Sequence, residues 1–548
     1  MAARVRGWLE SIPVPAGYIY SSIAALPDKQ QLQRNKCTGP ETIVKMKLCS
    51  PTLVTLYALG IGATSAQAAP DSNSTWPVQS FNSTDIRASI VESSKTGETE
   101  LGYIFLTPWN GHRSGHPSIY QDDGQLVWQG PEGTIYGFRP QKLHGNPMLV
   151  YWEGQFTGTG YGHGAINLRN SSYDLVHKIT LSGEYFNTGL DQEVESHIDY
   201  HEGIVENDKG SILVAAVNIT QADLQSVGGP KDGWVVDGLI YDIDIATNKV
   251  LFRWSAVEHI DQIPFKLSQR PLAGTGTSEK NPWDFFRTSS TVRYGDDYLI
   301  SWDYGCSILH VARNGTVSWN LNGINGGDFK LGLNSNFCFQ YGFRLNEQSE
   351  EKLSVSMHNN DNSEFSNGRN PSTGLVLDID LQKKEVIGKR RLWNRENPVV
   401  SRDLGSFQSL PNGHALVHHG QIPLIEEYNQ DDKLVMQIRY GHDLVDASYR
   451  VHRVAWTGMP SAKPSVKACR KTDKDIVVFV SWNGATDVKS WKLSEYSDDR
   501  KVNEIKNEPW GGFETMIQAQ TTSKKVLVSA VGGPGNGVQS DPIAIGEC

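Results

Sequence analysis

One pattern repeats along most of the chain and constrains its fold more than any other feature. A short apolar strand is followed by a turn rich in Gly, Asp and Asn and then by a second strand. Examples are GQLVWQG (124–130), NKVLFRWSA (248–256), GDDYLISW with NGTVSWNLNG (295–302, 314–323), KLSVSMHNN with GLVLDIDLQKKEVIG (352–360, 374–388), and LPNGHALVHH with LIEEYNQDDKLVMQIRYG (410–419, 424–441). With the stretches near 135–182 and 197–222, these make about six units of roughly 40–65 residues over 95–458.

Repeats of this length predict an all-β fold, a six-bladed β-propeller over residues 96–460. A series of β-sandwiches and a β-helix are the alternatives. The spacing is too long for a β-helix, and the repeats are too numerous for one sandwich. Residues 461–548 alternate apolar and polar side chains without a helical period, which favours a small immunoglobulin- or fibronectin-like β-sandwich. Residues 69–95 are rich in Ser, Thr, Asn and Pro and are expected to form an N-terminal arm, either a lead-in strand or a loose segment.

The segment from Met46 has the pattern of a secretory signal peptide: one Lys, an apolar run and the small-residue site Ala66-Gln67-Ala68. We therefore expect residues 46–68 to be a signal peptide and residues 1–45 to be a gene-model extension; an internal membrane anchor is the alternative. The mature chain would carry 44 Lys and Arg against 58 Asp and Glu, a net charge of −14. This balance predicts a secreted or vesicular protein, without a stable membrane span, and argues against nucleic-acid binding.

Cysteines and sequons agree with the secretory pathway. Four cysteines remain after residue 68, and local pairing of Cys306 with Cys338 and of Cys469 with Cys548 is favoured among three connectivities. N-glycosylation sequons begin at Asn73, Asn82, Asn170, Asn218 and Asn314.

Two segments carry the first candidate site residues. In HIDYHEGIVEN (197–207), His201 follows Asp199, and a His next to a carboxylate can be held in one tautomer and act as acid or base. A zinc site through His197 and His201 is the alternative, but that spacing suits zinc only on a helix, so no metal is expected. In WDFFRTSS (283–290), Arg287 offers a cation to an oxyanion, or else it pairs with Asp284 at the surface.

Further candidates lie at strand ends. Trp302, Asp303 and Tyr304 end the strand YLIS, where an aromatic, an acid and a phenol would hold a planar ligand. Phe286, Tyr341, His358, His418 and His419 are the other candidates for contact with a ligand, and packing or structural hydrogen bonding is the alternative for each. The sequence has no G-x-S-x-G element, no phosphate-binding glycine loop and no zinc quartet, and no cofactor is expected.

Several segments together resemble the arylsulfotransferase-like six-bladed propellers in their fungal secreted branch. These are SHIDYHEGIV, WDFFRTSSTVRYGDDYLISWDYGCSILHVARNGTVSWNLNG, NFCFQYGFRL, GSFQSLPNGHALV, SYRVHRVAWTGMP and, in the tail, VSWNGATDVKSWKL. The resemblance covers most of residues 95–540 and implies the propeller fold followed by a sandwich.

The resemblance also implies a chemistry, in which a nucleophilic histidine carries a sulfuryl group while His, Asn and Arg side chains stabilise its oxygens. The family's D-x-H-E element matches residues 199–202, so His201 is retained. Its H-I-N-S element falls on 287–290, where Arg287 replaces the His. Its S-A-R-H element falls on 301–304, where Asp303 replaces the Arg. Its Q-H-D-A-R element falls on 340–344, where Tyr341 replaces the nucleophilic His.

These replacements weaken the expectation of sulfuryl transfer, because a phenol is a poor substitute for imidazole and Asp303 would repel a sulfate. Relatives that act as hetero-Diels–Alderases, joining a tropolone-derived quinone methide to a humulene-type terpene, imply a small-molecule cyclase of secondary metabolism that takes an aromatic or terpenoid ligand. In that reaction the pocket would hold both reactants in place, Arg287 or Tyr341 would polarise an oxygen, and His201 with Asp303 would assist proton transfer. Arylsulfotransferase activity and a non-catalytic ligand-binding propeller are the alternatives.

Overall fold

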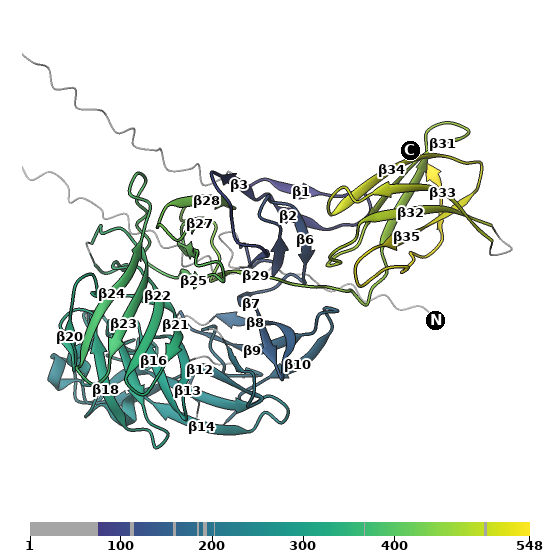
Figure 1. The fold of residues 1–548 in the computed structure, drawn as a ribbon. Coiled ribbons are helices and arrows are strands. Elements are labelled where there is room, and N and C mark those ends of the chain that lie inside the picture. Colours follow the sequence, from purple (N-terminus) through teal and green to yellow (C-terminus); the bar gives the residue numbers. More distant parts are fainter. Residues whose placement is uncertain are drawn as a thin grey trace, which may run out of the picture. The chain divides into compact units, whose positions relative to one another are not determined.

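The computed structural model describes residues 75–109, 114–156, 160–183, 186–189, 194–201, 203–366, 368–497 and 501–548. Residues 69–548 form one compact unit. The expected extension (1–45), the expected signal peptide (46–68) and the Asn73 sequon lie outside the described residues. In the described part of the chain, no helix is both long and apolar enough to cross a membrane. Regular structure there is all-β apart from the short 3-10 helices η1 (Gln225–Val227), η2 (Val257–His259) and η3 (Phe265–Leu267) (Figure 1).

Six sheets follow one another along the chain between Glu92 and Val454, and the four main strands of each pair antiparallel. Sheet 1 contains β29 (Val451–Val454), β4 (Tyr103–Leu106), β5 (Ser118–Tyr120) and β6 (Leu126–Gln129). Sheet 2 contains β7 (Ile135–Leu143), β8 (Asn146–Phe156), β9 (Gly162–Arg169) and β10 (Leu175–Ile179). Sheet 3 contains β11 (Ile204–Glu206), β12 (Ser211–Ala222), β13 (Gly233–Asp244) and β14 (Val250–Ser255).

The next three sheets each add a short fifth strand at one edge. Sheet 4 contains β15 (Thr288–Tyr294), β16 (Asp297–Trp302), β17 (Ser307–Val311), β18 (Val317–Asn322) and β19 (Gly326–Gly327). Sheet 5 contains β21 (Gln340–Gln348), β22 (Lys352–Asn359), β23 (Thr373–Asp380), β24 (Glu385–Leu392) and β20 (Lys330–Leu331). Sheet 6 contains β25 (Ser406–Ser409), β26 (Ala415–His418), β27 (Leu424–Tyr428), β28 (Leu434–Arg439) and β3 (Glu92–Lys95). The segment 69–95, expected to be an arm, therefore contributes β3, as well as a hairpin of β1 (Val78–Ser80) and β2 (Arg87–Ser89).

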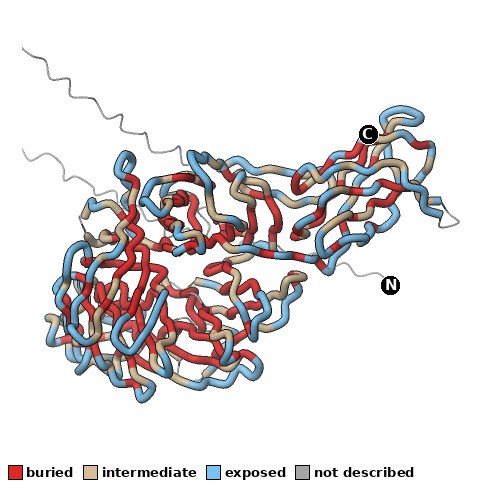
Figure 2. The backbone as a smooth tube through the Cα atoms, viewed as in Figure 1, coloured by how far each residue is buried: buried red, intermediate tan, exposed pale blue. Residues whose placement is uncertain are grey.

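The position of a strand within its sheet follows from its hydrophobic pattern. The middle strands β12 and β22 are continuous apolar or small runs and are buried on both faces. The outer strands β10 and β24 alternate with charged residues and are largely exposed. Figure 2 shows the same gradient, with buried segments inside the group of sheets and exposed segments at its edge.

Hydrophobic clusters join each sheet to the next. Because successive side chains of a strand point to opposite faces, Ile104 packs toward sheet 6 while Phe105 packs toward sheet 2. In the same way, Leu299 packs toward sheet 5 and Ile300 toward sheet 3. The remaining clusters join sheet 2 to sheet 3 and sheet 5 to sheet 6. Sheet 6 thus packs against sheet 1, so the series of sheets returns to its start.

The first strands of the six sheets also contact one another in a closed order. β29 contacts β7, β7 contacts β11, β11 contacts β15, β15 contacts β21, β21 contacts β25, and β25 contacts β29. The strand that completes sheet 1, β29, comes from the far end of this part of the chain and pairs with β4. The starts of these first strands therefore bring together residues that are hundreds of positions apart in the sequence.

Residues after 460 form two four-stranded sheets. Sheet 7 contains β30 (Ser465–Arg470), β31 (Asp475–Ser481), β34 (Glu514–Gln520) and β37 (Gly546–Glu547). Sheet 8 contains β32 (Ser490–Tyr496), β33 (Val502–Pro509), β35 (Lys525–Val531) and β36 (Ile543–Ala544). They share one hydrophobic cluster that includes Val478, Leu493 and Val528. Disulfides join Cys306 to Cys338 and Cys469 to Cys548, the local pairing that the sequence favoured.

Candidate functional site

Polar and aromatic side chains gather at the starts of the first strands. His201 precedes β11, Arg287 precedes β15, Tyr341 is the second residue of β21, and Arg450 precedes β29. The end of β16 lies beside the start of β15, so Asp303 reaches the same place. We call the following residues the ring cluster: Tyr161, Asp199, Tyr200, His201, Asp284, Arg287, Asp303, Tyr304, Tyr341, Tyr449 and Arg450. All are buried except Arg287, whose side chain keeps 12% exposure.

Asp199 and His201 form a buried dyad. The carboxylate of Asp199 accepts a hydrogen bond from Nδ1 of His201 through Oδ2 and one of 2.7 Å from the backbone N–H of Gly162 through Oδ1. Because Nδ1 carries the proton, the lone pair of His201 is on Nε2. Nε2 is buried and has no hydrogen-bond partner in the part of the chain that the structure describes. The imidazole stacks on Tyr200 at 4.4 Å between ring centroids. The dyad is therefore arranged as a nucleophile or base whose reactive nitrogen is unused.

Arg287 supplies a cation beside this dyad. Its Nη2 donates to Asp284 at 3.0 Å, and its guanidinium carbon lies 4.9 Å from the ring centre of Tyr161 and 5.3 Å from that of Tyr304. Burial acts to lower the pKa of Arg287, but the neighbouring Tyr304 and the other acidic groups raise it well above its ordinary value, so the side chain stays charged. The pair with Asp284, which the sequence placed at the surface as an alternative, does form but is largely buried.

Arg450 supplies a second cation from sheet 1. Its Nη2 donates to the carbonyl of Ser289 at 3.1 Å and to the hydroxyl of Tyr449 at 3.3 Å, and Nη1 donates to the carbonyl of Gly405. Its guanidinium carbon lies 4.3 Å from the ring centre of Tyr449 and 5.5 Å from that of Tyr341. Arg450 thus ties three sheets together at the ring cluster.

Asp303 is a buried acid whose surroundings favour the neutral form. Burial, together with the nearby Asp403, raises its pKa well above the ordinary value of 3.8, while Arg287 and a hydrogen bond from Tyr341 act in the opposite direction. Its Oδ1 has no hydrogen-bond partner among the described residues. Burial therefore disfavours the negative charge that the sequence analysis expected Asp303 to place against a sulfate.

Ring contacts connect the dyad to both arginines. The Tyr161 ring lies 6.4 Å from the imidazole of His201 and carries Arg287 over its face. The Tyr449 ring lies 6.3 Å from the same imidazole and carries Arg450. Each arginine therefore contacts a tyrosine ring that lies near the imidazole of His201.

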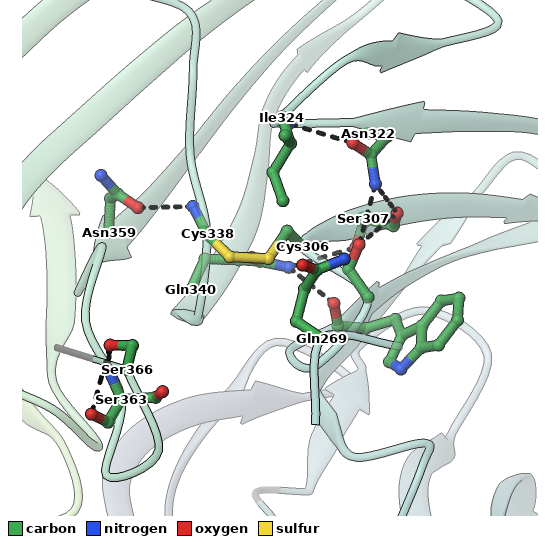
Figure 3. Close-up of a disulfide and its surroundings, with 12 residues drawn as sticks. Gln269, Cys306, Ser307, Asn322, Ile324, Cys338, Gln340, Asn359, Ser363 and Ser366 are labelled. Carbon is green, nitrogen blue, oxygen red and sulfur yellow. Dashed lines mark hydrogen bonds between the residues drawn. A yellow bond between two sulfur atoms is a disulfide. The ribbon is translucent and has the colours of Figure 1, made fainter. Parts of the chain in front are cut away.

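The disulfide Cys306–Cys338 fixes the segments that carry Asp303 and Tyr341 (Figure 3). The backbone N–H of Cys306 donates to the carbonyl of Asp303 at 3.0 Å. The side chain of Gln340, next to Tyr341, donates to the carbonyls of Trp302 and Ser307, each at 3.1 Å. The end of β16 and the start of β21 are therefore held together by one covalent bond and by hydrogen bonds.

Two residues predicted to contact a ligand lie in the hydrophobic core instead. Phe286 and Trp302 are fully buried and stack on each other at 4.9 Å, and the indole N–H of Trp302 donates to the carbonyl of Phe285 at 3.1 Å. Trp283 and Phe285 belong to the same cluster between sheets 3 and 4. Tyr304 differs, since its ring lies under Arg287 and its hydroxyl accepts from Arg270 at 3.0 Å. The aromatic part of WDFFRTSS packs the scaffold, and its charged pair, Asp284 and Arg287, belongs to the ring cluster.

The remaining predicted histidines form a separate buried network between sheets 5 and 6. Nε2 of His358 lies 3.3 Å from Nδ1 of His419, whose Nε2 lies 3.2 Å from Glu426. Nε2 of His418 lies 2.7 Å from the hydroxyl of Tyr440. Burial and the adjacent histidines lower the pKa values of His358 and His418 well below their ordinary value. Hydrogen bonds tie one or both ring nitrogens of these residues into the scaffold, while Nδ1 of His358 and Nδ1 of His418 have no hydrogen-bond partner among the described residues.

A metal centre finds no support in the described ranges, where no group of three or more His, Cys, Asp or Glu side chains is placed to hold an ion. His197 packs against Phe186 and His163. Glu202, the last residue of the D-x-H-E element, lies outside the described residues.

The sequence analysis did not name Tyr161, Tyr449 or Arg450 as candidates. It considered Asp284 only as a partner of Arg287 at the surface, whereas the residue is buried. Arg450 stands immediately before the last repeated strand, as Arg287 stands immediately before β15. Aligning the repeats on the starts of their first strands would have found it. Tyr161 precedes β9, which is not a first strand, so the repeat pattern carries no signal for it.

Comparison with known proteins places the chain in a family. Several solved structures align with it at low identity. The GH43 protein BlXynB from Bacillus licheniformis, in a mutant form, is 8% identical over 75% of this chain and 89% of that chain, with a TM-score of 0.30. Catalytically inactive virginiamycin B lyase from Staphylococcus aureus is 9% identical over 72% and 96%, with a TM-score of 0.25. AztD from Citrobacter koseri is 9% identical over 77% and 100%, with a TM-score of 0.26. At these values the likeness does not bear on activity.

No curated protein matches the chain. The family model for arylsulfotransferase (ASST) matches residues 139–441, a segment that contains Tyr161, the dyad, Arg287, Asp303 and Tyr341. Because this segment spans more than half of the 548 residues, the protein belongs to the arylsulfotransferase (ASST) family.

Proposed function

We propose that the protein transfers a sulfuryl group from an aryl sulfate to a phenol and that His201 carries the group between them. One observation carries this proposal: Nε2 of His201 is buried and unpartnered among the described residues while Asp199 holds Nδ1. Imidazole is suited to this task because it is both a nucleophile and a good leaving group. Tyr341 stands where the family has its nucleophilic histidine. In this protein we therefore assign the nucleophile to another position of the same ring cluster, His201.

The chemistry balances with the groups present. The Nε2 lone pair attacks the sulfur of the donor, and the bond from sulfur to the aryl oxygen breaks with its electron pair on that oxygen. Asp199 offsets the positive charge that develops on the imidazole. Asp303, whose neutral form is favoured, is the group that we assign to protonate the departing phenolate. In the second step the acceptor oxygen attacks sulfur, the bond from nitrogen to sulfur breaks, and the acceptor proton returns to Asp303.

The two guanidinium groups have a role in both steps. A sulfuryl group in transfer carries negative charge on its oxygens, and fixed cations in a dry site stabilise such charge strongly. Arg287 and Arg450 each contact a tyrosine ring that lies near the imidazole, Tyr161 and Tyr449 respectively. Burial of the site also keeps water from the intermediate, which would otherwise hydrolyse.

The test is release of 4-nitrophenol from 4-nitrophenyl sulfate in the presence of a phenol acceptor. We expect turnover that is lost in His201→Ala and retained in His177→Ala, a matched change of a half-buried histidine in the outer strand β10. Turnover that persists in His201→Ala would reject His201 as the carrier. No turnover in the wild-type protein with any aryl sulfate donor would reject sulfuryl transfer.

A second candidate function is cyclisation of the hetero-Diels–Alderase type. The observation that favours it is the aromatic lining of the ring cluster, which contains the rings of Tyr161, Tyr200, Tyr304, Tyr341 and Tyr449. Such walls suit a planar, largely apolar ligand, and Arg287 would polarise a quinone-methide oxygen.

Its test is incubation with a tropolone quinone-methide precursor and humulene, followed by chiral chromatography. A single-enantiomer product above the spontaneous background, lost in Arg287→Ala or Tyr341→Phe, would support cyclisation. A racemic product in all samples would reject it. If neither assay detects a product that the protein forms, a ligand-binding protein without catalytic activity is the remaining interpretation.

The architecture that we propose for this site is a six-bladed β-propeller over residues 96–460, with a β-sandwich over 461–548. The closed order of the first strands and the packing of sheet 6 on sheet 1 support the first part. The shared core of sheets 7 and 8 supports the second. A crystal structure with any other number of sheets around the axis would refute the propeller. We also propose passage through the secretory pathway, for which a mass shift on glycosidase treatment of secreted protein is the test.

A further inference from the structure

A cavity of about 300 Å³ lies away from the ring cluster, between sheet 1 and the residues that follow 460. Tyr103 and Gln121 line it from sheet 1, and Trp482, Trp491, Trp510 and Phe513 line it from the C-terminal part. We call it the tryptophan cavity. The two sides are held together by reciprocal hydrogen bonds between Asn483 and the backbone of Gln129, at 2.8 and 2.9 Å. The cavity is therefore built between two parts of the chain that are firmly joined.

The aromatic residues of this cavity differ in their access to solvent. Trp482 and Trp491 are almost fully buried, whereas Trp510 and Tyr103 are half-buried. The indole N–H of Trp482 donates to the carbonyl of Ala462 at 2.6 Å. The indole N–H of Trp491, at 2% exposure, has no acceptor in the described part of the chain. Trp510 and Tyr103 are therefore the aromatic rings of this cavity that a ligand can reach.

Polar groups complete the lining with opposite charges. Asp487 and Lys489 are both exposed at the cavity, and the hydroxyl of Thr486 and the amide of Gln121 lie with them. Burial and the nearby carboxylate of Asp487 raise the pKa of Tyr103, so its hydroxyl remains a donor. The cavity therefore offers donors and acceptors around aromatic faces and carries no net charge from Asp487 and Lys489.

We propose that the tryptophan cavity binds a neutral pyranose sugar. A pyranose ring presents apolar C–H faces, which pack on aromatic rings, and an equatorial belt of hydroxyl groups, which both donate and accept hydrogen bonds. Trp510 and Tyr103 supply the faces, and Asp487 and Lys489 supply partners for the hydroxyls. The volume is at the small end of ligand sites, which suits one or two sugar rings. The ring cluster takes no part, so this inference does not depend on the proposed function.

The test is titration of the full chain with cellobiose, xylobiose, mannobiose and N,N′-diacetylchitobiose, followed by tryptophan fluorescence and calorimetry. We expect saturable binding of at least one of these disaccharides. Trp510→Ala should weaken it by at least about tenfold, because the aromatic face is lost, and Asp487→Asn should weaken it less. Trp393→Ala is the matched control, since Trp393 is a half-buried tryptophan outside the cavity, and should leave affinity unchanged.

Any of three results would overturn the proposal. One is the absence of saturable binding for all four disaccharides up to their solubility limits. Another is binding that Trp510→Ala leaves unchanged while the variant keeps the wild-type thermal transition. Binding that is lost equally in Trp393→Ala would also place the sugar elsewhere.

Discussion

A single carboxylate sets which nitrogen of His201 is reactive. Asp199 accepts from Nδ1 of the imidazole and from the backbone of Gly162, so it fixes both the tautomer and the orientation of the ring. Such a carboxylate does not need to move a proton itself in order to matter. At the scale of the residue, the function of the site therefore depends on one hydrogen bond between two buried side chains.

Asp199→Asn should reduce kcat/KM for sulfuryl transfer by about 10²–10⁴-fold. The amide oxygen can still accept from Gly162, but the amide nitrogen would donate to Nδ1 and leave the proton on Nε2, where it blocks attack. Measurement of nitrophenol release together with the thermal transition separates this effect from unfolding. Unchanged activity in a folded variant would show that the tautomer of His201 is irrelevant.

Asp303→Asn should stabilise the protein more at pH 8 than at pH 5. Burial raises the pKa of Asp303 above 3.8, so the folded state keeps a proton that the unfolded chain releases. The stability that Asp303 contributes is complete below about pH 3.8 and is lost as the pH rises through the raised pKa. Asn mimics the neutral acid at every pH, and denaturant unfolding of both proteins at the two pH values measures the difference. A difference that is independent of pH would contradict the assignment of Asp303 as a neutral acid.

At the scale of the element, the disulfide Cys306–Cys338 joins the end of β16 to the start of β21 and so fixes Asp303 and Tyr341 in the ring cluster. The second disulfide, Cys469–Cys548, joins β30 to the C-terminus in another part of the chain. The two bonds close loops of 32 and 79 residues and are a matched pair for separating stability from activity.

Replacing either pair by serine should lower the free energy of unfolding by about 3–5 kcal/mol, because both loops are long in the unfolded chain. Only Cys306→Ser with Cys338→Ser should also lower kcat/KM, since the segments carrying Asp303 and Tyr341 lose their link. Both variants are assayed at a temperature where their circular dichroism matches the wild type. Equal activity in the two variants would show that the first disulfide does not position Asp303 and Tyr341.

The sequence predicted where strands form better than it predicted the direction in which their side chains point. The strand pair in YLISWDYGCSILHVA became β16 and β17, because apolar runs separated by a glycine turn determine a hairpin locally. The neighbouring Phe286 was expected to contact a ligand, but it lies with Trp283 and Phe285 in the core between sheets 3 and 4. Their direction depends on which sheet packs beside them, and no local pattern encodes that.

At the scale of the whole molecule, the site exists only because the sheets return to their start. β29 pairs with β4 across more than 300 residues of chain, and it brings Arg450 to the ring cluster. Next to this pairing, Arg453 on β29 donates to Glu427 of β27 at 2.7 Å and pairs with Asp122 near β5. This ion network joins sheets 1 and 6 where the series closes.

Arg453→Met should lower the free energy of unfolding by about 3–5 kcal/mol, because Glu427 is fully buried and would lose its cation. Lys389→Met is the control, since Lys389 and its partner Asp378 are exposed at 3.8 Å, and should change stability by less than about 1 kcal/mol. Denaturant midpoints measure both. Similar midpoints for the two variants would show that the closure does not depend on this network.

The composition of the ring cluster shows how far sequence reasoning reaches. His201, Arg287, Asp303, Tyr304 and Tyr341 were named from motifs that stand beside strands. Their pKa values and their partners depend on burial by distant segments, so the raised pKa of Asp303 and the second cation, Arg450, emerged only from the assembled sheets. Local sequence identifies the candidate residues. Their burial and their partners depend on the packing of sheets that are distant in the sequence.

The most direct measurement is rapid quench of the wild-type protein with 4-nitrophenyl sulfate without acceptor, followed by mass spectrometry of its peptides at alkaline pH. We predict one sulfuryl group on the peptide that contains His201, formed with a matching burst of nitrophenol, and its absence in His201→Ala. A burst with the sulfuryl group on Tyr341 or on His419, or turnover without any modified peptide, would contradict the central role of His201.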